Sequence, residues 1–442
     1  MPPDVFAVPV FDKWLVYAPL HRVVALVNRA ALTEFPEQLC AALAEPPEPE
    51  PLLRQGPVNP PFLGLVPTRA CNLSCAYCGF GATPCGEQMD LALAAAGVDW
   101  MADHAARSGR RTLDVHFFGG EPFSAPDVVD VAVHRTRAAA AEKGLLPRLE
   151  VATNGVYSEA RARFVGDYFD TVVLSFDGFR AVHDRHRPTL GGRGCFDQVA
   201  ATARVLSASP AELCLRICVA QDNVEQLAET VDWFAQEFQP CSIDFETLQP
   251  TPESERAGLR PPDPYAFAAQ FLGARRVATE HGVEPVYAAA VTEEPRLTFC
   301  PVGNDTLIVN PDGRVSACYL QERDWQARGL DLNLGRLSAD GRLELPPEDV
   351  ERLRRLVTDK PRCRNCFCRW SCAGGCQVNH SYPGCSPAYD DFCIQTRLIT
   401  ACSLLDGLGQ EALSGDLVAE PARMQRLAKW PSDRLEDSRG AA

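Results

Sequence analysis

Short apolar segments alternate with longer amphipathic segments between Phe62 and about Tyr287. The predicted strands are Phe62–Val66, Leu113–Phe118, Leu149–Thr153, Val172–Ser175, Leu213–Val219 and Ile243–Glu246. The predicted helices are Met89–Ala106, Val128–Lys143, Phe196–Leu206, Val224–Phe238 and Tyr265–His281. Apolar strands separated by helices favour a parallel sheet with crossover connections, an α/β fold. These strands are too few to close an eight-stranded barrel, so we expect a partial (β/α)6 barrel with its chemistry at the C-terminal strand ends.

Cysteine is unusually frequent in this chain, with 19 among 442 residues. An odd count, in a long chain without a basic segment and apolar core at its N-terminus, argues against an exported, disulfide-bonded protein. Metal or cluster ligation in a reducing cytoplasm fits better. The net charge of −15 disfavours non-specific binding to nucleic acid. No apolar run has the length of a transmembrane helix, so we expect no nucleic-acid or membrane partner.

Three cysteines follow the first predicted strand, in the run Cys71-Asn-Leu-Ser-Cys75-Ala-Tyr-Cys78. A cubane 4Fe-4S cluster has four irons, and this loop offers only three thiolates. One iron is then left without a protein ligand and can bind a small molecule instead. A zinc knuckle is the alternative interpretation of the loop taken alone.

The cysteine loop resembles the signature of radical SAM enzymes, in which an aromatic residue, here Tyr77, precedes the third cysteine. The resemblance implies that the open iron binds the amino and carboxylate groups of S-adenosylmethionine (SAM). The run Gly119-Gly120-Glu121-Pro122 follows the second predicted strand, and in radical SAM enzymes this motif contacts the methionine amino group. The resemblance therefore puts Gly120 and Glu121 beside SAM. An ordinary strand-to-helix turn is the alternative.

Polar residues also follow the third and fourth predicted strands. Asn154 lies just beyond the third strand, and Ser175 and Asp177 lie at the end of the fourth. At the barrel mouth, such amide, hydroxyl and carboxylate groups could hydrogen-bond the hydroxyls of a ribose.

The run that begins at Ser175 continues through His183 and Asp184 to Arg187, and it resembles a stretch of peptide-modifying radical SAM enzymes. The resemblance implies that Ser175 and Arg187 contact SAM, with the guanidinium of Arg187 on the methionine carboxylate. A surface ion pair is the alternative for Arg187. Leu248, after the sixth strand, occupies the place where that family packs or hydrogen-bonds the adenine.

A second cysteine pattern occupies the C-terminal part of the chain. Its members are Cys300, Cys318, Cys363, Cys366, Cys372, Cys376 and Cys393. Between the first two, Asn310-Pro311-Asp312-Gly313 predicts a hairpin turn. The pattern resembles the SPASM domain, a cluster-binding extension of peptide and protein maturases.

The SPASM resemblance implies two auxiliary 4Fe-4S clusters, three clusters in all. The implied ligands of the first are Cys300, Cys318 and Cys376, and those of the second are Cys363, Cys366, Cys372 and Cys393. A fourth ligand of the first cluster is not evident, so that position is open or is filled by another residue. The candidates are Cys368, Cys385 and Cys402, for which ordinary buried thiols are the simpler interpretation. A pair of zinc sites is the alternative for the whole stretch.

The remaining chain suggests four parts. Residues 1–60 form a segment with predicted strands Val5–Val10 and Leu15–Ala18 and predicted helices Val23–Leu32 and Glu37–Leu43, a leader-peptide-binding or barrel-capping element. Residues 61–290 form the partial barrel, and residues 291–406 form the cysteine-rich extension. Residues 407–442 are expected to form a peripheral helix and a frayed tail.

Together these resemblances imply an enzyme that cleaves SAM reductively and abstracts hydrogen from a ribosomally made peptide to install an oxidative modification such as a crosslink. Its partners would be a precursor peptide and a one-electron reductant such as flavodoxin or ferredoxin. A sulfatase-type formylglycine maturase is the first alternative, but that relative has an Asp base where this chain has Tyr319. A non-catalytic iron–sulfur electron-transfer protein and a zinc-binding interaction protein are the others.

Overall fold

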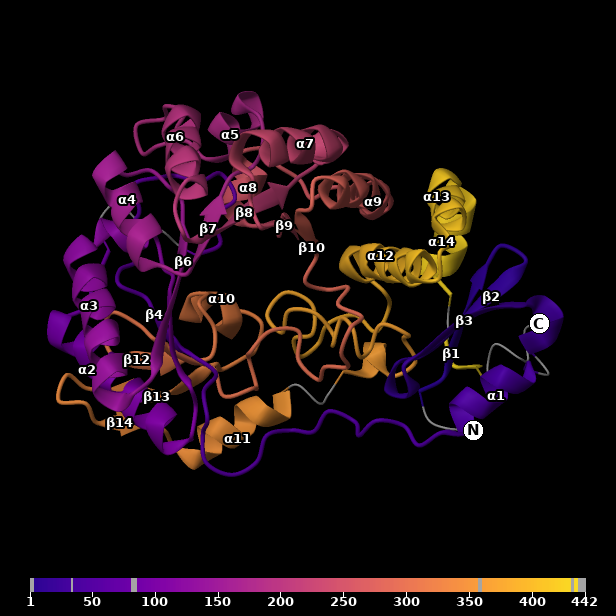
Figure 1. The fold of residues 1–442 in the computed structure, drawn as a ribbon, viewed down its shortest axis with the longest axis horizontal. Coiled ribbons are helices and arrows are strands. Elements are labelled where there is room, and N and C mark those ends of the chain that lie inside the picture. Colours follow the sequence, from indigo (N-terminus) through magenta and orange to yellow (C-terminus); the bar gives the residue numbers. More distant parts are fainter. Residues whose placement is uncertain (1–3, 33–34, 81–85, 357–359, 431–432, 436–442) are drawn as a thin grey trace.

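A curved sheet with helices on its outer face dominates the molecule (Figure 1). The computed structural model describes residues 4–32, 35–80, 86–356, 360–430 and 433–435. The parallel strands of the barrel are β4 (Leu63–Leu65), β5 (Thr112–Phe117), β6 (Leu146–Thr153), β7 (Thr171–Ser175), β8 (Glu212–Val219) and β9 (Ser242–Thr247). The helices of this region are α2 (Leu91–Arg107), α3 (Pro126–Lys143), α4 (Glu159–Tyr168), α5 (Arg180–His186), α6 (Phe196–Ser207), α7 (Leu227–Phe238), α8 (Pro252–Arg256) and α9 (Pro264–Glu280).

Side-chain alternation along the strands separates a helix-facing surface from an inner surface. In β5, Leu113, Val115 and Phe117 are buried, whereas Asp114 and His116 between them are partly exposed. Because successive side chains of a strand point to opposite faces, the apolar set meets the helices and the polar set faces the inside of the arc. The expected partial barrel is confirmed, with an inner surface that carries charged groups.

The sheet continues beyond both edges of the barrel. Strand β10 (Glu284–Val286) pairs in parallel with β9, and β11 (Leu307–Val309) pairs in parallel with β4 in the register Leu63↔Leu307. The predicted hairpin is confirmed, because β11 and β12 (Arg314–Ser316) are antiparallel and Gly313 adopts a φ of 82°. Strands β13 (Asn333–Leu337) and β14 (Leu343–Glu344) complete an 11-stranded sheet. The first part of the cysteine-rich extension is therefore built into the barrel sheet.

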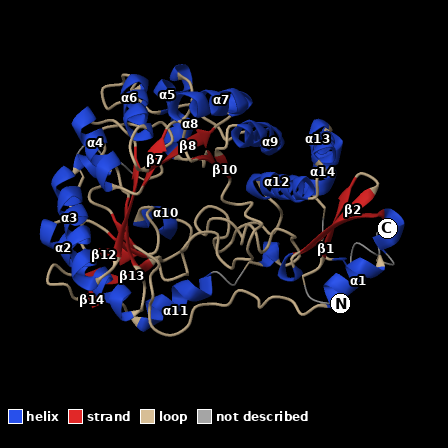
Figure 2. Cartoon of the chain, viewed as in Figure 1, coloured by secondary structure: helices blue, strands red, loops and turns tan. Residues whose placement is uncertain are grey.

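The remaining extension is mostly loop and short helix (Figure 2). Its helices are α10 (Glu322–Gln326), α11 (Pro347–Leu356), α12 (Asp391–Gly407), α13 (Glu411–Ala419) and α14 (Pro421–Ala428). Helix α12 begins at a carboxylate cap, since the side chain of Asp390 accepts a hydrogen bond from the backbone N–H of Cys393 at 2.9 Å. It packs against α9 of the barrel. None of the helices in the described ranges has the length and apolarity that a membrane crossing requires.

The N-terminal segment is a three-stranded antiparallel sheet followed by one helix. Its elements are β1 (Phe6–Val10), β2 (Lys13–Ala18), β3 (Val23–Asn28) and α1 (Glu37–Ala44). The predicted helix over 23–32 is wrong for its first part, because Val23 and Val24 extend as β3 along the full length of β2. β-branched residues pack well on a pleated surface, and a neighbouring strand decides the conformation here.

Part of the expected frayed tail is ordered. The backbone N–H of Ala7 donates to the carbonyl of Asp433 at 2.7 Å, so residues 433–435 lie along the outer edge of β1. Asp433 is fully buried and forms an ion pair with the fully buried Arg397 of α12. A buried guanidinium needs a carboxylate, and the tail supplies it. The N-terminal sheet also contacts the cysteine-rich loop, where Trp370 donates its indole N–H to Asp4 at 3.0 Å.

Candidate active site

The three cysteines of the first loop lie close together at the C-terminal end of β4. Burial raises the pKa of Cys71 to about 11, and Cys78 adds to this shift. Burial also raises the pKa of Cys75, with further contributions from Cys78 and Cys71. Thiols with raised pKa values are protonated at neutral pH, so binding of iron must release their protons. The structure thus brings the first predicted ligand set together.

The glycines that follow β5 allow the cysteine loop to lie against the strand end. A Cβ on Gly120 would come within 2.2 Å of the carbonyl oxygen of Ala70, and one on Gly119 within 2.6 Å of that of Thr68. The backbone N–H of Glu121 donates to the same Ala70 carbonyl at 2.8 Å. The sequence predicts that these glycines allow a ligand to come close. In the structure they allow the backbone of the cysteine loop to come close.

Glu121 joins the ends of β5 and β6. Its buried carboxylate accepts hydrogen bonds from the Thr153 hydroxyl at 2.8 Å and from the backbone N–H of Asn154 at 2.7 Å. Burial raises its pKa to about 7, although these hydrogen bonds favour the charged form. Glu121 therefore positions the two strand ends through its side chain.

Asn154 lies against the cysteine loop. Its side-chain N–H group donates to the Asn72 side-chain oxygen at 2.8 Å and lies 3.6 Å from the sulfur of Cys71. Asn72 in turn donates to the carbonyl of Val156 at 2.7 Å. Sequence analysis gave Asn72 no role, because nothing in the loop's spacing indicates which intervening residue supports it.

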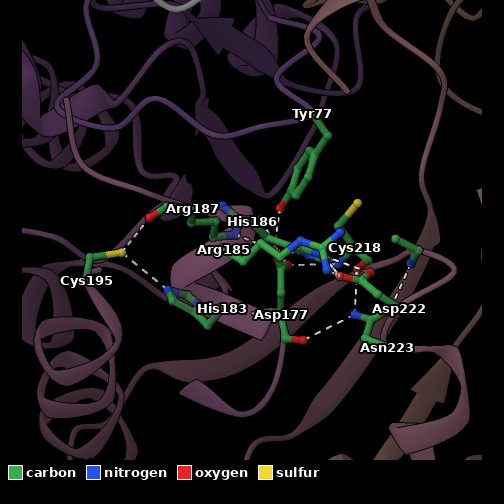
Figure 3. Close-up of polar contacts among 11 residues, drawn as sticks. Tyr77, Asp177, His183, Arg185, His186, Arg187, Cys195, Cys218, Asp222 and Asn223 are labelled. Carbon is green, nitrogen blue, oxygen red and sulfur yellow. Dashed lines mark hydrogen bonds and ion pairs between the residues drawn. The ribbon is translucent and has the colours of Figure 1, made fainter. Parts of the chain in front are cut away.

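Asp177 is the centre of a buried network behind the cysteine loop (Figure 3). One carboxylate oxygen accepts from the Tyr77 hydroxyl at 2.6 Å and from Nε of Arg187 at 2.9 Å. The other accepts from the backbone N–H of Cys218 at 3.0 Å. Arg187 is 8% exposed, so its ion pair with Asp177 is buried and does not lie on the surface. Asp177 is fully occupied by protein donors.

Two buried histidines flank this carboxylate in different charge states. Burial disfavours the charged form of His186, but Asp177 at 3.4 Å and Asp222 at 3.1 Å outweigh it and raise its pKa to about 9. Burial lowers the pKa of His183 to about 4. The Nδ1 atom of neutral His183 accepts the backbone N–H of Asp177 at 3.3 Å. At neutral pH we therefore assign a charged His186 and a neutral His183.

The combined contribution of these two histidines to stability is greatest near pH 6.5. The contribution of His186 is complete below the unfolded pKa of about 6.5 and is lost as the pH rises through about 9. The contribution of His183 is complete above about 6.5 and is lost as the pH falls toward about 4. Scanning fluorimetry across this range should show that His186→Gln flattens the alkaline side and leaves the acid side in place. An unchanged alkaline side would contradict this assignment.

Ser175 and Leu248 lie at the same end of the barrel. Ser175 is the last residue of β7 and is partly exposed. Leu248 follows β9, is 2% exposed, and packs in a cluster that includes Tyr77 and Cys218. Of these two predicted SAM contacts, Leu248 therefore packs against the cysteine loop.

A second thiol group combines residues from distant parts of the chain. Burial raises the pKa of Cys318, and the thiols of Cys300 and Cys376 raise it further, so the three lie near one another. Two of the three candidates for a fourth ligand lie elsewhere, because Cys402 points at the carbonyl of Ser414 and Cys368 lies against Cys366.

A third thiol group lines one cavity. The cavity is bounded by all four predicted ligands of the second auxiliary cluster, Cys363, Cys366, Cys372 and Cys393. Arg397 donates to the sulfur of Cys366 at 3.4 Å, and Arg362 lies 3.7 Å from the sulfur of Cys393. Guanidinium groups around thiolates offset the negative charge of a thiolate-bound cluster. This donor set fits a cluster.

The thiol spacing bears on the zinc alternative. Within the described ranges, no three His, Cys, Asp or Glu side chains are close enough together to hold a single metal ion. A zinc ion draws its ligands onto one centre, whereas a cubane binds each thiolate through a different iron. Cys85 lies outside the described residues.

Arg69 connects the barrel to the extension, and sequence analysis missed it. Its guanidinium donates to the carbonyl of Tyr319 at 2.8 Å and to the Asn310 side chain at 2.7 Å. The Tyr319 ring packs on Phe118 at 4.7 Å, and its hydroxyl lies 2.7 Å from where a Cβ on Gly64 would stand. These contacts hold Tyr319, the residue after Cys318, beside β4, the strand that precedes the cysteine loop.

Comparisons with known proteins agree with this arrangement. Residues 65–234 match the model of the radical SAM superfamily. The serine-type anaerobic sulfatase-maturating enzyme of Klebsiella aerogenes is 25% identical over 81% of this chain and 87% of that protein. The PqqA peptide cyclase of Ruegeria pomeroyi is 28% identical over 58% of this chain and 66% of that protein.

Solved structures share the fold. Native anSMEcpe with bound AdoMet and Cp18Cys peptide superposes with a TM-score of 0.62 at 18% identity, over 80% of this chain and 99% of that one. Streptococcus suis SuiB bound to S-adenosylmethionine superposes with a TM-score of 0.53 at 14% identity, over 86% and 96%. From the cysteine loop, the partial barrel and these matches, we conclude that the chain is an enzyme that carries a radical SAM domain at residues 65–234.

Proposed function

We propose that the protein is a radical SAM maturase that installs an oxidative modification, such as a crosslink, in a ribosomally made peptide. The observation that carries this proposal is the joining of the extension to the barrel: β11 pairs with β4, the strand that precedes Cys71, and Arg69 donates to the carbonyl of Tyr319, the residue after Cys318. Two of the curated relatives are named for maturing a sulfatase and cyclising a peptide, which supports a polypeptide substrate.

In this proposal Cys71, Cys75 and Cys78 hold the SAM-binding cluster. When bound, a reduced 4Fe-4S cluster with SAM supplies one-electron cleavage of the sulfonium and hydrogen abstraction from an unactivated carbon. Gly120 and Asn154 hold the cysteine loop against the strand ends and line the SAM site. Ser175 and Leu248 bound the same mouth, at the ribose and adenine.

Glu121, Tyr77, Asp177 and Arg187 are proposed to position that site. The Asp177 carboxylate has no oxygen left for a ribose, because protein donors use both. Its role is to fix Tyr77 of the cysteine loop and to orient Arg187 toward the methionine carboxylate. Tight orientation of these groups excludes water and holds the reacting carbon in place.

Two auxiliary clusters on the extension would accept the second electron of an oxidative modification. The ligands are those named above, with the fourth position of the first cluster left to substrate or another residue. A flavodoxin or ferredoxin would supply the first electron.

The formylglycine alternative gains support from the sulfatase-maturating relative. It requires a base beside the second hairpin cysteine, and Tyr319 is there. Burial raises the pKa of Tyr319, which makes its phenolate scarcer still at neutral pH. Peptide modification is therefore the preferred function.

The N-terminal segment is proposed to recognise the precursor peptide. Its sheet has the order β1-β2-β3, and residues 433–435 cover β1, which leaves β3 as the other edge. An extended leader could add to β3 through main-chain hydrogen bonds. The partition into residues 1–60, 61–290, 291–406 and 407–442 is kept as part of this proposal.

Joint replacement of Cys71, Cys75 and Cys78 with Ala tests the function. We expect the reduced wild-type protein to form 5′-deoxyadenosine from SAM and the variant to form none. The variant should lose about four irons per chain, one cubane of the three. Chromatography of dithionite-reduced anaerobic samples and iron analysis measure both. Equal 5′-deoxyadenosine from wild type and variant, or none from wild type, contradicts the proposal.

A further inference from the structure

Glu246 presents a free carboxylate to the inside of the barrel. On β9, Ile243 and Phe245 are buried among the helices, so Asp244 and Glu246 point to the inner face. Asp244 is paired with Arg216 of β8 at 3.0 Å. The Glu246 side chain is exposed and forms no hydrogen bond or ion pair with any residue in the described part of the chain.

This carboxylate lies between the cysteine loop and the extension. Glu246 stands opposite Cys218 in the β8–β9 register, and the Cys218 backbone belongs to the Asp177 network. On the other side, the next residue, Thr247, accepts a hydrogen bond from Gln395 of α12 at 3.2 Å. The charge of Glu246 also raises the pKa of Cys376, a member of the second thiol group.

The surroundings of Glu246 are short of positive charge. The inner face carries Glu150, Asp244 and Glu246, and its arginines already have carboxylate partners, Arg216 with Asp244 and Arg148 with Asp170. His116 lies 3.8 Å from Glu150, but burial lowers its pKa, so it is neutral at pH 7. The Glu246 side chain is accessible to solvent, yet desolvation by the surrounding protein raises its pKa. It therefore faces an accessible space that protein encloses. A cation entering this space would be bound strongly.

We propose that Glu246 is a specificity-determining residue that binds a basic side chain, Lys or Arg, of the peptide substrate inside the barrel. The inference rests on the proposed function, because a substrate must pass between the SAM site and the auxiliary cysteines to meet both. An ammonium or guanidinium on Glu246 would place neighbouring peptide residues within that gap, and the carboxylate would gain the partner it lacks.

Peptide selection by the intact holoenzyme tests this role. The probes are four octapeptide mixtures with random flanks and a fixed Lys, Arg, Gln or Glu at one central position. Each is equilibrated with anaerobically reconstituted protein and SAM, and the bound peptides are quantified by mass spectrometry. We expect wild type to retain the Lys and Arg mixtures about tenfold more than the Gln mixture. Glu246→Gln should reduce that ratio to about one, and Glu246→Lys should shift the preference to the Glu mixture.

Glu253→Gln is the matched control, because Glu253 lies on α8 and pairs with Arg256 in an exposed ion pair. It should retain the wild-type preference. Equal retention of the Lys and Gln mixtures by wild type, no retention of any mixture, or an unchanged preference in Glu246→Gln overturns the proposal. Weaker SAM binding by Glu246→Gln, measured by equilibrium dialysis of SAM, also overturns it, because the carboxylate would then serve SAM. Formation of 5′-deoxyadenosine by the same wild-type sample shows separately whether the proposed function holds.

Discussion

Asp177→Asn should destabilise the radical SAM domain by about 3–5 kcal/mol. The change leaves the buried Arg187 guanidinium without a carboxylate and turns an amide N–H group toward the donors of Tyr77 and Arg187. Because Tyr77 belongs to the cysteine loop, we also expect loss of the iron held there. Urea unfolding followed by circular dichroism, with iron analysis of the purified variant, measures both effects.

Asp197→Asn is the matched control for this loss. Asp197 pairs with Arg180 at an exposed surface position, where its side chain is 79% exposed, so the unfolding midpoint should not move. The double variant Asp177→Asn/Arg187→Met should be more stable than Asp177→Asn alone, because the unpaired charge is gone. A double variant that loses the sum of the two single losses would show that these side chains are not coupled.

Replacing both Cys363 and Cys366 with Ala should spare SAM cleavage and abolish the modified peptide. The two cysteines line the same cavity with Cys372 and Cys393, so the cavity would keep two of its four predicted ligand thiols and the chain would lose about four irons. Mass spectrometry of a co-expressed precursor peptide should then find no loss of two hydrogens, while 5′-deoxyadenosine still forms. Unchanged product would remove the electron-relay role of this group.

Cys402→Ala provides a thiol-matched comparison. Cys402 is fully buried on α12, and its sulfur faces the carbonyl of Ser414, away from the cavity. We expect this variant to keep the wild-type iron content and product. Loss of iron from it would instead identify Cys402 as the missing ligand of the first auxiliary cluster.

The barrel could be predicted because its local signals agree with its tertiary environment. The predicted strand over 113–118 is β5 at Thr112–Phe117, and the predicted helix over 89–106 is α2 at Leu91–Arg107. Long apolar periodicity is a strong signal for such elements. The helix predicted over Val23–Leu32 is wrong at Val23–Asn28 because its periodicity is short. Pairing with β2 over the whole length of this segment decides its conformation.

The cysteine sets could be predicted because ligand spacing is a local property of the chain. The supports of the site could not, since they arise from contacts between distant strand ends. Asn72, Arg69 and Glu246 are ordinary polar residues in sequence, and only the fold reveals the contact of the first with Val156, that of the second with Asn310 and the place of the third on the inner face. Asp177, which the sequence suggested as a ribose contact, accepts hydrogen bonds from Tyr77 and Arg187, and nothing in the sequence indicates these two partners.

The parallel pairing of β11 with β4 has a consequence for electron movement. Main-chain hydrogen bonds, such as that from the Val66 N–H to the carbonyl of Val309 at 3.0 Å, join the hairpin that precedes Cys318 to the strand that precedes Cys71. If the proposed clusters are bound at these cysteines, two redox centres attached to one continuous sheet could not move apart as separately hinged domains would. Tunnelling between them would cross a gap of constant width, so its rate would be set by the backbone scaffold and not by the frequency of docking encounters.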